Sequence, residues 1–203
     1  MRLGRVEATG GFFLMLAWLN YLDRSFIVPM AAAACTAHEL GHFFMIQLLK
    51  GEVKRIRLTA VGAEMILGQP LGYWQEGMCA LAGPGVNLLL AMGCCSFQNG
   101  LAFAGLNLAL AIFNLLPVRQ LDGGRALCCT IALLAGPDCA ARTGCCLDCL
   151  CIGTALAAGI FLAESRGNIT LLLVALWLLT ASIRQGFGLQ TANIHRHIHR
   201  PGK

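Results

Sequence analysis

The sequence predicts an all-α polytopic membrane protein with about six transmembrane helices and one short, membrane-associated β-hairpin. Hydrophobic residues make up 57% of the 203 residues and charged residues only 12%, about half the charged share of a soluble domain. The mean hydropathy is +0.69. Several apolar runs approach or reach the length needed to cross a bilayer. We therefore expect a single membrane domain over residues 1–203, with a core at about 5–185 and a basic cytoplasmic tail at 186–203.

The expected spans are separated by short polar breaks. Asp23-Arg24-Ser25 interrupts the first two runs, Gln98-Asn99-Gly100 reads as a turn, and Pro117 ends the fourth run. The first run is short for a full crossing, so whether residues 11–22 fully span is left open. In chain order the expected spans are 11–22, 26–49, 75–97, 101–116, 144–163 and 169–183.

Residues 50–74 differ in character from the apolar runs. Basic residues crowd the start of this segment, and Arg55-Ile56-Arg57-Leu58 alternates polar with apolar side chains. β-branched residues are frequent nearby, and Gly62 suits a turn. This pattern favours a short β-hairpin over 53–67, with a plain basic loop as the alternative.

The 15 Lys and Arg residues are distributed unevenly around the expected spans. With the N-terminus in the cytoplasm, only Arg24 and Arg166 fall on the opposite side. This asymmetry follows the positive-inside rule and places both termini in the cytoplasm. The basic residues do not form one long patch, so no nucleic-acid partner is expected.

Two further groups of metal-binding residue types carry no clear assignment. Most of the 11 Cys lie in or beside apolar runs, where a thiol behaves as a small hydrophobe. The cluster at 145–151 holds one C-x-x-C, whereas a structural zinc site usually needs a second pair or histidines. His195, His197 and His199 lie in the basic tail and are expected to be solvated.

An H-E-x-x-H motif lies inside the second apolar run. His38 and His42 are four residues apart, so both imidazoles lie on one face of a helix and can reach one metal ion. Glu39 lies beside them, where it can accept a proton from the attacking water. Three ionisable groups in a membrane helix are costly and indicate a functional site. The alternative is a pair of satisfied core histidines with a buried glutamate.

A catalytic zinc ion needs a third protein ligand. Asp122 is the best candidate, because it follows a proline break and is next to Gly123 and Gly124, which allow close backbone approach. A simple helix-cap role for Asp122 is the alternative. Other carboxylates fit less well, since they border loops or lie by predicted membrane interfaces: Glu64, Glu76, Asp138, Asp148 and Glu164.

Four motifs occur together in a diagnostic order. They are His-Glu-Leu-Gly-His at 38–42, Ala-Gly-Pro-x-x-Asn at 82–87, Asn-Leu-Leu-Pro at 114–117 and Leu-Asp-Gly-Gly at 121–124. Together they resemble the site-2 protease family of intramembrane zinc metalloproteases over roughly residues 5–185. Within that family the chain is most similar to the small six-span bacterial branch, typified by the sporulation protease that processes a membrane-tethered pro-sigma factor.

The resemblance implies a complete site and a location in the bacterial cytoplasmic membrane. One zinc ion per chain would be bound by His38, His42 and Asp122, with Glu39 as general base and acid. Asn114 matches a family asparagine that could steady the developing oxyanion. The family acts on membrane-tethered proteins near the cytoplasmic face and leaves room for an inhibitory membrane partner. The element at 82–87 is a family signature, and the sequence alone assigns it no chemical role in this chain.

An unwound substrate segment has to be held while it is cut. We expect residues 53–67 to bind it by strand addition, with Ile56 among the backbone donors.

Other classes remain as alternatives. A non-proteolytic metal-binding membrane protein could be a transporter or a pseudoprotease adaptor. A transporter should show internal repeats and ionisable residues on several spans, and neither is evident. An adaptor should have lost the base or a ligand. A peptidase with a glutamate as third ligand and a cytosolic catalytic domain conflicts with the apolar surroundings of His38.

Overall fold

The computed structural model describes residues 2–3, 6–9, 14, 17, 21, 23, 26–59, 62–97, 100–167 and 169–183. Most of the expected first span at 11–22 lies outside this set, as does the tail with His195, His197 and His199. The elements in chain order are β1 (Arg2–Leu3), β2 (Val6–Ala8), α2 (Ile27–Leu48), β3 (Val53–Thr59), β4 (Gly62–Leu67), α3 (Tyr73–Cys94), α4 (Leu101–Asn114), α5 (Asp122–Ala135) and α6 (Pro137–Arg166). A further helix, Thr170–Ile183, is here named the C-terminal helix.

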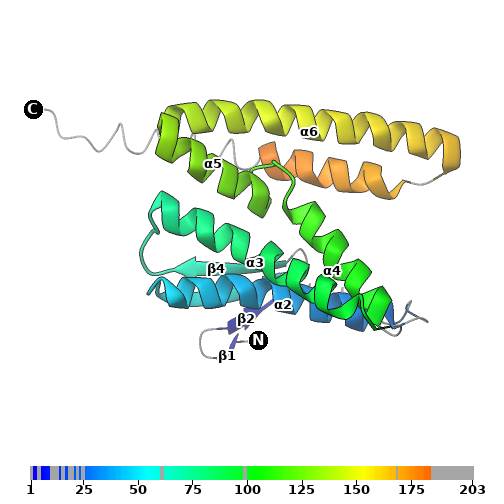
Figure 1. The fold of residues 1–203 in the computed structure, drawn as a ribbon. Coiled ribbons are helices and arrows are strands. Elements are labelled where there is room, and N and C mark those ends of the chain that lie inside the picture. The colour runs from blue at the N-terminus through cyan, green and yellow to red at the C-terminus, as the bar shows by residue number, and fades with distance from the viewer. Residues whose placement is uncertain are drawn as a thin grey trace, which may run out of the picture.

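The helices form two groups, and the loop between α4 and α5 connects them. In the first, α3 packs against both α2 and α4, and the sheet lies beside α2 (Figure 1). In the second, α6 runs alongside the C-terminal helix, and α5 packs against both α3 and α6. The start of α5 therefore lies where the two groups meet, which is where Asp122 is placed.

Small residues dominate the helix interfaces. Most of the buried apolar residues within the described helices are alanines, including Ala80 and Ala111 at 0% exposure. A Cβ atom on Gly41 of α2 would lie 2.8 Å from the carbonyl oxygen of Ala82 on α3. Such close backbone approach is typical of membrane helices, where lipid is as apolar as leucine and packing must supply the attraction.

Large apolar side chains lie on the outside of the molecule. Phe44, Leu89 and Phe161 are each more than 60% exposed, as expected for a surface that faces lipid. Two described helices, Tyr73–Cys94 and Pro137–Ser165, are long and apolar enough to cross a membrane. Helix α2 has 22 residues as well, but the polar motif lowers its hydropathy. Two shorter apolar helices are Leu101–Asn114 and Thr170–Ile183. The count of six spans stays a prediction.

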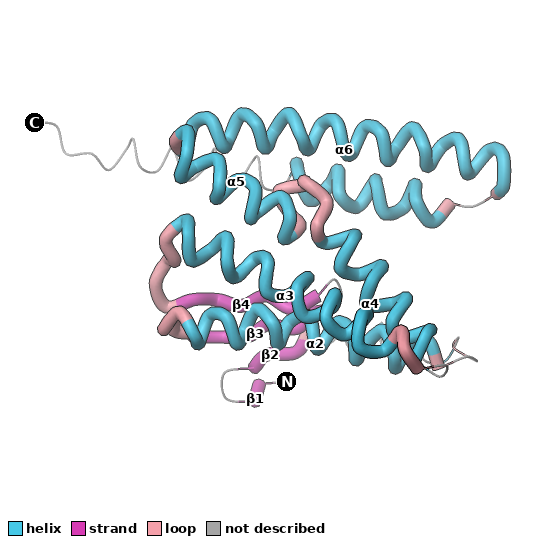
Figure 2. The backbone as a smooth tube through the Cα atoms, viewed as in Figure 1, coloured by secondary structure: helices cyan, strands magenta, loops and turns pink. Residues whose placement is uncertain are grey.

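The predicted β-hairpin is confirmed. β3 and β4 pair antiparallel, with Ile56 opposite Met65 and Thr59 opposite Gly62 (Figure 2). The sequence did not predict β1 and β2, whose two and three residues are too short to show alternation. They extend the sheet to the order β1-β2-β3-β4, in which β2 runs parallel to β3.

This sheet order corrects one expectation. Ile56 was expected to offer its backbone to a substrate, but it lies opposite Val6 on one side and Met65 on the other. β3 is therefore an interior strand. Within the described part of the chain, β4 is the free edge on the hairpin side of the sheet.

The hairpin is attached to the motif helix through an apolar cluster. Ile46, Val53 and Cys79 are its buried members, drawn from α2, β3 and α3. Phe43, next to His42, and Met65 of β4 pack against them. The free strand edge therefore belongs to a sheet that is fixed to the turn of α2 that carries His42.

Candidate metal centre

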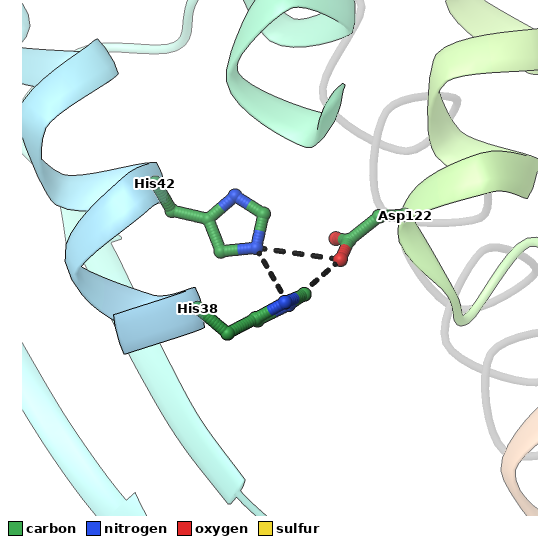
Figure 3. A group of neighbouring side chains, drawn as sticks. All are labelled: His38, His42 and Asp122. Carbon is green, nitrogen blue, oxygen red and sulfur yellow. Dashed lines mark hydrogen bonds and ion pairs between the residues drawn. The ribbon is translucent and has the colours of Figure 1, made fainter. Parts of the chain in front are cut away.

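The structure brings three of the predicted site residues together. His38 and His42 project from α2, and Asp122 projects from the first residue of α5, with all three side chains converging on one point (Figure 3). His38 and Asp122 are separated by 84 positions in the sequence. They are 6% and 8% exposed. Among the described residues, this is the group of His, Cys, Asp and Glu side chains that could hold a metal ion.

The spacing of the three ligand atoms suits tetrahedral zinc. His38 Nε2 lies 3.1 Å from His42 Nε2 and 3.0 Å from Asp122 Oδ2. His42 Nε2 lies 3.3 Å from Asp122 Oδ2. Zinc binds imidazole nitrogen and carboxylate oxygen at about 2.0–2.1 Å, so two tetrahedral ligands are about 3.3 Å apart. All three separations agree with that value to within a few tenths of an ångström.

Hydrogen bonds on the far side of each ring fix the protonation of the histidines. His38 Nδ1 donates to Asn87 Oδ1 at 2.6 Å. This assignment follows because Asn87 Nδ2 is already donating, to Ala34 O at 3.2 Å and to Asn107 Oδ1 at 2.7 Å. His42 Nδ1 donates to the carbonyl oxygen of Cys79 at 2.7 Å. In its neutral form, each ring therefore presents an unprotonated Nε2 to the centre of the group.

Three lone-pair-bearing atoms thus face one another in a buried place. Two imidazole nitrogens and one carboxylate oxygen repel each other unless a cation lies between them. A single added proton would satisfy one of the three contacts, whereas a metal ion satisfies all three at once. The donor set and its hydrogen-bonded support fit a zinc ion.

Two buried asparagines support His38. Asn87 of α3 and Asn107 of α4 are both 0% exposed, and Asn107 Nδ2 is anchored on Phe103 O at 2.9 Å. Asn87 is the last residue of the Ala-Gly-Pro-x-x-Asn motif, whose role was left open, and its role is to orient the His38 ring. Asn107 was not among the predicted site residues. Its signal is an amide in the middle of the apolar run 101–116, where a polar group needs a partner.

Gly83 of the same motif makes room for the histidine rings. A Cβ atom there would collide with His42 Nε2 and would lie 2.9 Å from His38 Cε1. Gly83 directly follows Ala82, whose carbonyl oxygen faces Gly41, so one stretch of α3 backbone lies against both α2 and its two rings. The motif therefore serves the metal centre through a missing side chain and an amide.

The start of α5 positions Asp122. Gly123 and Gly124 lie directly against the carbonyl groups of Leu115 and Val118, where any Cβ atom would collide. This confirms the expected close backbone approach. The helix-cap alternative is not seen, because the N-cap residue is Leu121 and no side chain caps the helix.

The second oxygen of Asp122 faces a charged pair. Asp122 Oδ1 lies 3.9 Å from Arg125 Nη1, and Arg125 Nη2 donates to Glu76 Oε1 at 3.4 Å. Arg125 and Glu76 are both substantially exposed, so solvent weakens the attraction between them.

The other two predicted site residues, Glu39 and Asn114, are not members of this group of three. Glu39 is partly exposed on α2, one residue after His38. Asn114 ends α4, and its Nδ2 donates to Leu110 O in its own helix at 3.0 Å. The catalytic roles of Glu39 and Asn114 stay predictions. All 11 cysteines are free thiols, and Cys145, Cys146 and Cys149 are exposed.

A sequence comparison found a relative that is named as a zinc metalloprotease. The chain is 41% identical over 108 residues to a Synechocystis protein named "Putative zinc metalloprotease sll0528". The match covers 47% of this chain and 28% of that relative. No family model matches the chain.

A solved structure shares the fold. The site-2 protease from Methanocaldococcus jannaschii superimposes with a TM-score of 0.62 over 88% of this chain and 89% of that one, at 22% sequence identity. The chain therefore has the site-2 protease fold, as the sequence motifs indicated. The name of the Synechocystis relative describes the same broad class, a zinc metalloprotease.

The geometry at Gly83 gives a matched pair of variants. Gly83→Ala should abolish high-affinity zinc binding, because its Cβ enters the space of the His42 ring. Gly85→Ala should leave zinc binding unchanged, because nothing lies within 4 Å of its Cβ. Helix propensity would favour alanine at both positions. Zinc content measured by mass spectrometry on purified protein distinguishes them, and equal zinc content in both variants would contradict the crowding argument.

The amide of Asn87 should affect metal affinity without touching the metal. Asn87→Leu keeps the branched shape of the side chain but removes the acceptor for His38 Nδ1–H, and we expect zinc affinity to fall by about 10- to 100-fold. Competition with a chelator measures the change. Thr154→Ala is the control, because that hydroxyl bonds only within α6, on Leu150 and Cys151. An unchanged affinity in Asn87→Leu would remove Asn87 from the metal centre.

Proposed function

We propose that this chain is an intramembrane zinc endopeptidase that cleaves a membrane-tethered protein near the cytoplasmic face of the bacterial cytoplasmic membrane. The observation that carries the proposal is the convergence of three lone-pair-bearing atoms, 3.0–3.3 Å apart, in an apolar helix bundle. One zinc ion per chain would be held by His38, His42 and Asp122. The site-2 protease fold and the metalloprotease relative support the assignment.

The chemistry divides between the ion and the side chains. A bound zinc ion supplies Lewis acidity, which polarises the scissile carbonyl and acidifies water. Glu39 accepts the proton of the attacking water and returns it to the leaving amine. The amide of Asn114 steadies the negative charge that develops on the carbonyl oxygen. Asn87 and the Cys79 carbonyl hold the two rings in the tautomer that the ion requires.

The placement in the membrane rests on surface chemistry and charge. Exposed apolar side chains cover the helices, and two helices have the length and apolar character of spans. The distribution of Lys and Arg supports a cytoplasmic position for both termini. The lipid bilayer is therefore the proposed partner of the apolar helix surface, and an inhibitory membrane protein is a further candidate partner. No nucleic acid is expected to bind.

The free edge of β4 is the proposed holding site for the substrate. A helical substrate must unwind before cleavage, because its backbone hydrogen bonds hide the peptide bond. β4 offers unpaired backbone groups to the unwound segment, and its Met65 packs on the same apolar cluster as Phe43 of α2. Backbone pairing gives affinity with little demand on sequence.

The alternative is a metal-binding membrane protein without proteolysis. A pseudoprotease adaptor would be expected to lack the base or a ligand, yet Glu39 and the three ligands are present. Helices α5 and α6 do not repeat the H-E-x-x-H pattern of α2, so the repeat symmetry typical of transporters is not evident. The endopeptidase is the better supported function.

The role of Glu39 is tested by separating zinc binding from turnover. Glu39→Gln should keep one zinc ion per chain and lose about 10²- to 10⁴-fold in cleavage rate, because an amide cannot accept the proton. Asp122→Ala should lose both zinc and cleavage, whereas Asp138→Ala, an exposed carboxylate on α6, should lose neither. The assay is cleavage of candidate single-span substrates in membranes. Full turnover by Glu39→Gln with zinc bound would refute the assignment.

Substrate contact should follow strand order in the sheet. In the Glu39→Gln background, which traps substrate, a photo-cross-linker at Ile66 on β4 should capture the substrate. The same cross-linker at Arg57 on β3 should capture much less, because Arg57 is paired with Glu7 on β2 and with Glu64 on β4. Cross-links from positions beside Asn114 but none from Ile66 would show that substrate is held elsewhere.

A further inference from the structure

A second buried charge lies outside the metal centre. Asp148 on α6 is 2% exposed, although the sequence predicted that it lies by a membrane interface. It sits within a helix that is apolar enough to span the bilayer. A carboxylate in that position is costly unless it is paired and fully hydrogen-bonded.

Asp148 is bonded to two other elements. Its Oδ1 accepts the backbone N–H of Arg119 at 2.9 Å, and its Oδ2 accepts Arg119 Nε at 2.7 Å. Ser182 Oγ of the C-terminal helix donates to Oδ2 at 3.3 Å. One carboxylate therefore connects α6, the C-terminal helix and the loop between α4 and α5.

The loop held in this way is the one that leads to Asp122. Arg119 precedes Asp122 by three residues, and its neighbours Val118 and Leu121 are 1% and 5% exposed. These two side chains pack into a cluster with Ile152 of α6 and Leu178 of the C-terminal helix. The loop is thus fixed against the second helix group by apolar contacts on both sides of Arg119.

Helix α6 is shaped to receive Arg119. A Cβ atom at Gly144, one turn before Asp148, would lie 2.7 Å from Arg119 Cδ and 2.9 Å from Cys128 Sγ. Gly144 and Asp148 are four residues apart and share a helix face. The arginine stem crosses the glycine and its guanidinium reaches the carboxylate.

We infer that Asp148 is a positioning residue for the metal centre, acting through Arg119 to fix the loop that places Asp122 opposite His38 and His42. The inference rests on the proposed metal site. The hydrogen bonds on the far side of the two histidine rings go to Asn87 and Cys79 of α3, and Asn87 is bonded in turn to Asn107 of α4. Asp122 arrives from the other helix group, and a metal site requires its ligands within about 0.5 Å of the productive geometry. The bond from Arg119 N–H to Asp148 supplies a directional restraint close to the ligand.

A merely structural ion pair would behave differently. Replacing both members of a buried pair by apolar residues often restores stability. It cannot restore a backbone hydrogen bond, because no acceptor then faces the Arg119 N–H. In a variant that removes both charges, thermal stability should therefore recover while metal affinity stays low.

The experiment uses the full chain in detergent, loaded with zinc or with cobalt(II). Asp148→Ala should lower zinc affinity by about 10- to 100-fold, as for other residues that support a ligand, and should alter the visible cobalt spectrum. Arg119→Leu/Asp148→Leu should regain thermal stability over Asp148→Ala yet keep the lowered affinity and altered spectrum. Asp138→Ala should match the unmodified chain in all three measurements.

Three outcomes are distinguishable. Recovery of affinity and spectrum together with stability in the double variant would overturn the positioning role and leave a structural ion pair. The positioning role is equally overturned if Asp148→Ala folds and binds zinc as tightly as the unmodified chain. If the unmodified chain itself does not bind zinc or cobalt through His38, His42 and Asp122, the proposed function fails first, and the variants of Asp148 are not needed to show it.

Discussion

The structure depends on the cost of bringing three lone-pair-bearing atoms together inside an apolar bundle. His38 Nε2, His42 Nε2 and Asp122 Oδ2 lie within 3.3 Å of one another. When both rings are neutral, all three atoms face inward as acceptors, and a cation between them relieves their mutual repulsion. The surrounding protein must also resist the collapse of this arrangement, because each group would gain by turning away. The polar interactions of α3 and α4 and the packing of the loop before α5 supply that resistance.

The interactions that hold the three ligands in place are of the kinds that stabilise membrane proteins. Lipid offers no hydrophobic force between helices, so close packing and buried hydrogen bonds take its place. Gly41, Gly83 and Gly144 each bring a neighbouring backbone or side chain into the space of a missing Cβ atom. Asn87 and Asn107 form a chain of amides whose donors and acceptors are used within the bundle. The same features that join the helices therefore also orient the ligands.

Local patterns in the sequence predicted much of this arrangement. The four-residue spacing of His38 and His42 fixes their shared face, and the glycines after Asp122 predict close backbone approach. Alternation at 55–58 predicted the hairpin. Each of these signals is contained in a few consecutive residues, so it can be read without knowledge of the fold.

The features that were missed depend on partners far apart in the chain. Asn107 and Asp148 look like isolated polar residues until Asn87 and Arg119 are placed beside them, 20 and 29 positions away. β1 and β2 are too short to be recognised alone, and their pairing made β3 interior, which overturned the expectation at Ile56. The number of spans is also not decided by local hydropathy, because the motif that marks α2 as functional makes it less apolar.

The metal centre is divided unequally between the two helix groups. Its histidines come from one helix whose rings are fixed by neighbours in the same group. Its carboxylate comes from the other group, through a loop with Val118 and Leu121 buried against α6 and the C-terminal helix. Those two helices contribute no ligand, yet the position of Asp122 depends on them. The division gives the helices that follow the motifs a role at the site: the third ligand lies 84 residues from the first, and its helix α5 packs against α6 as well as against α3.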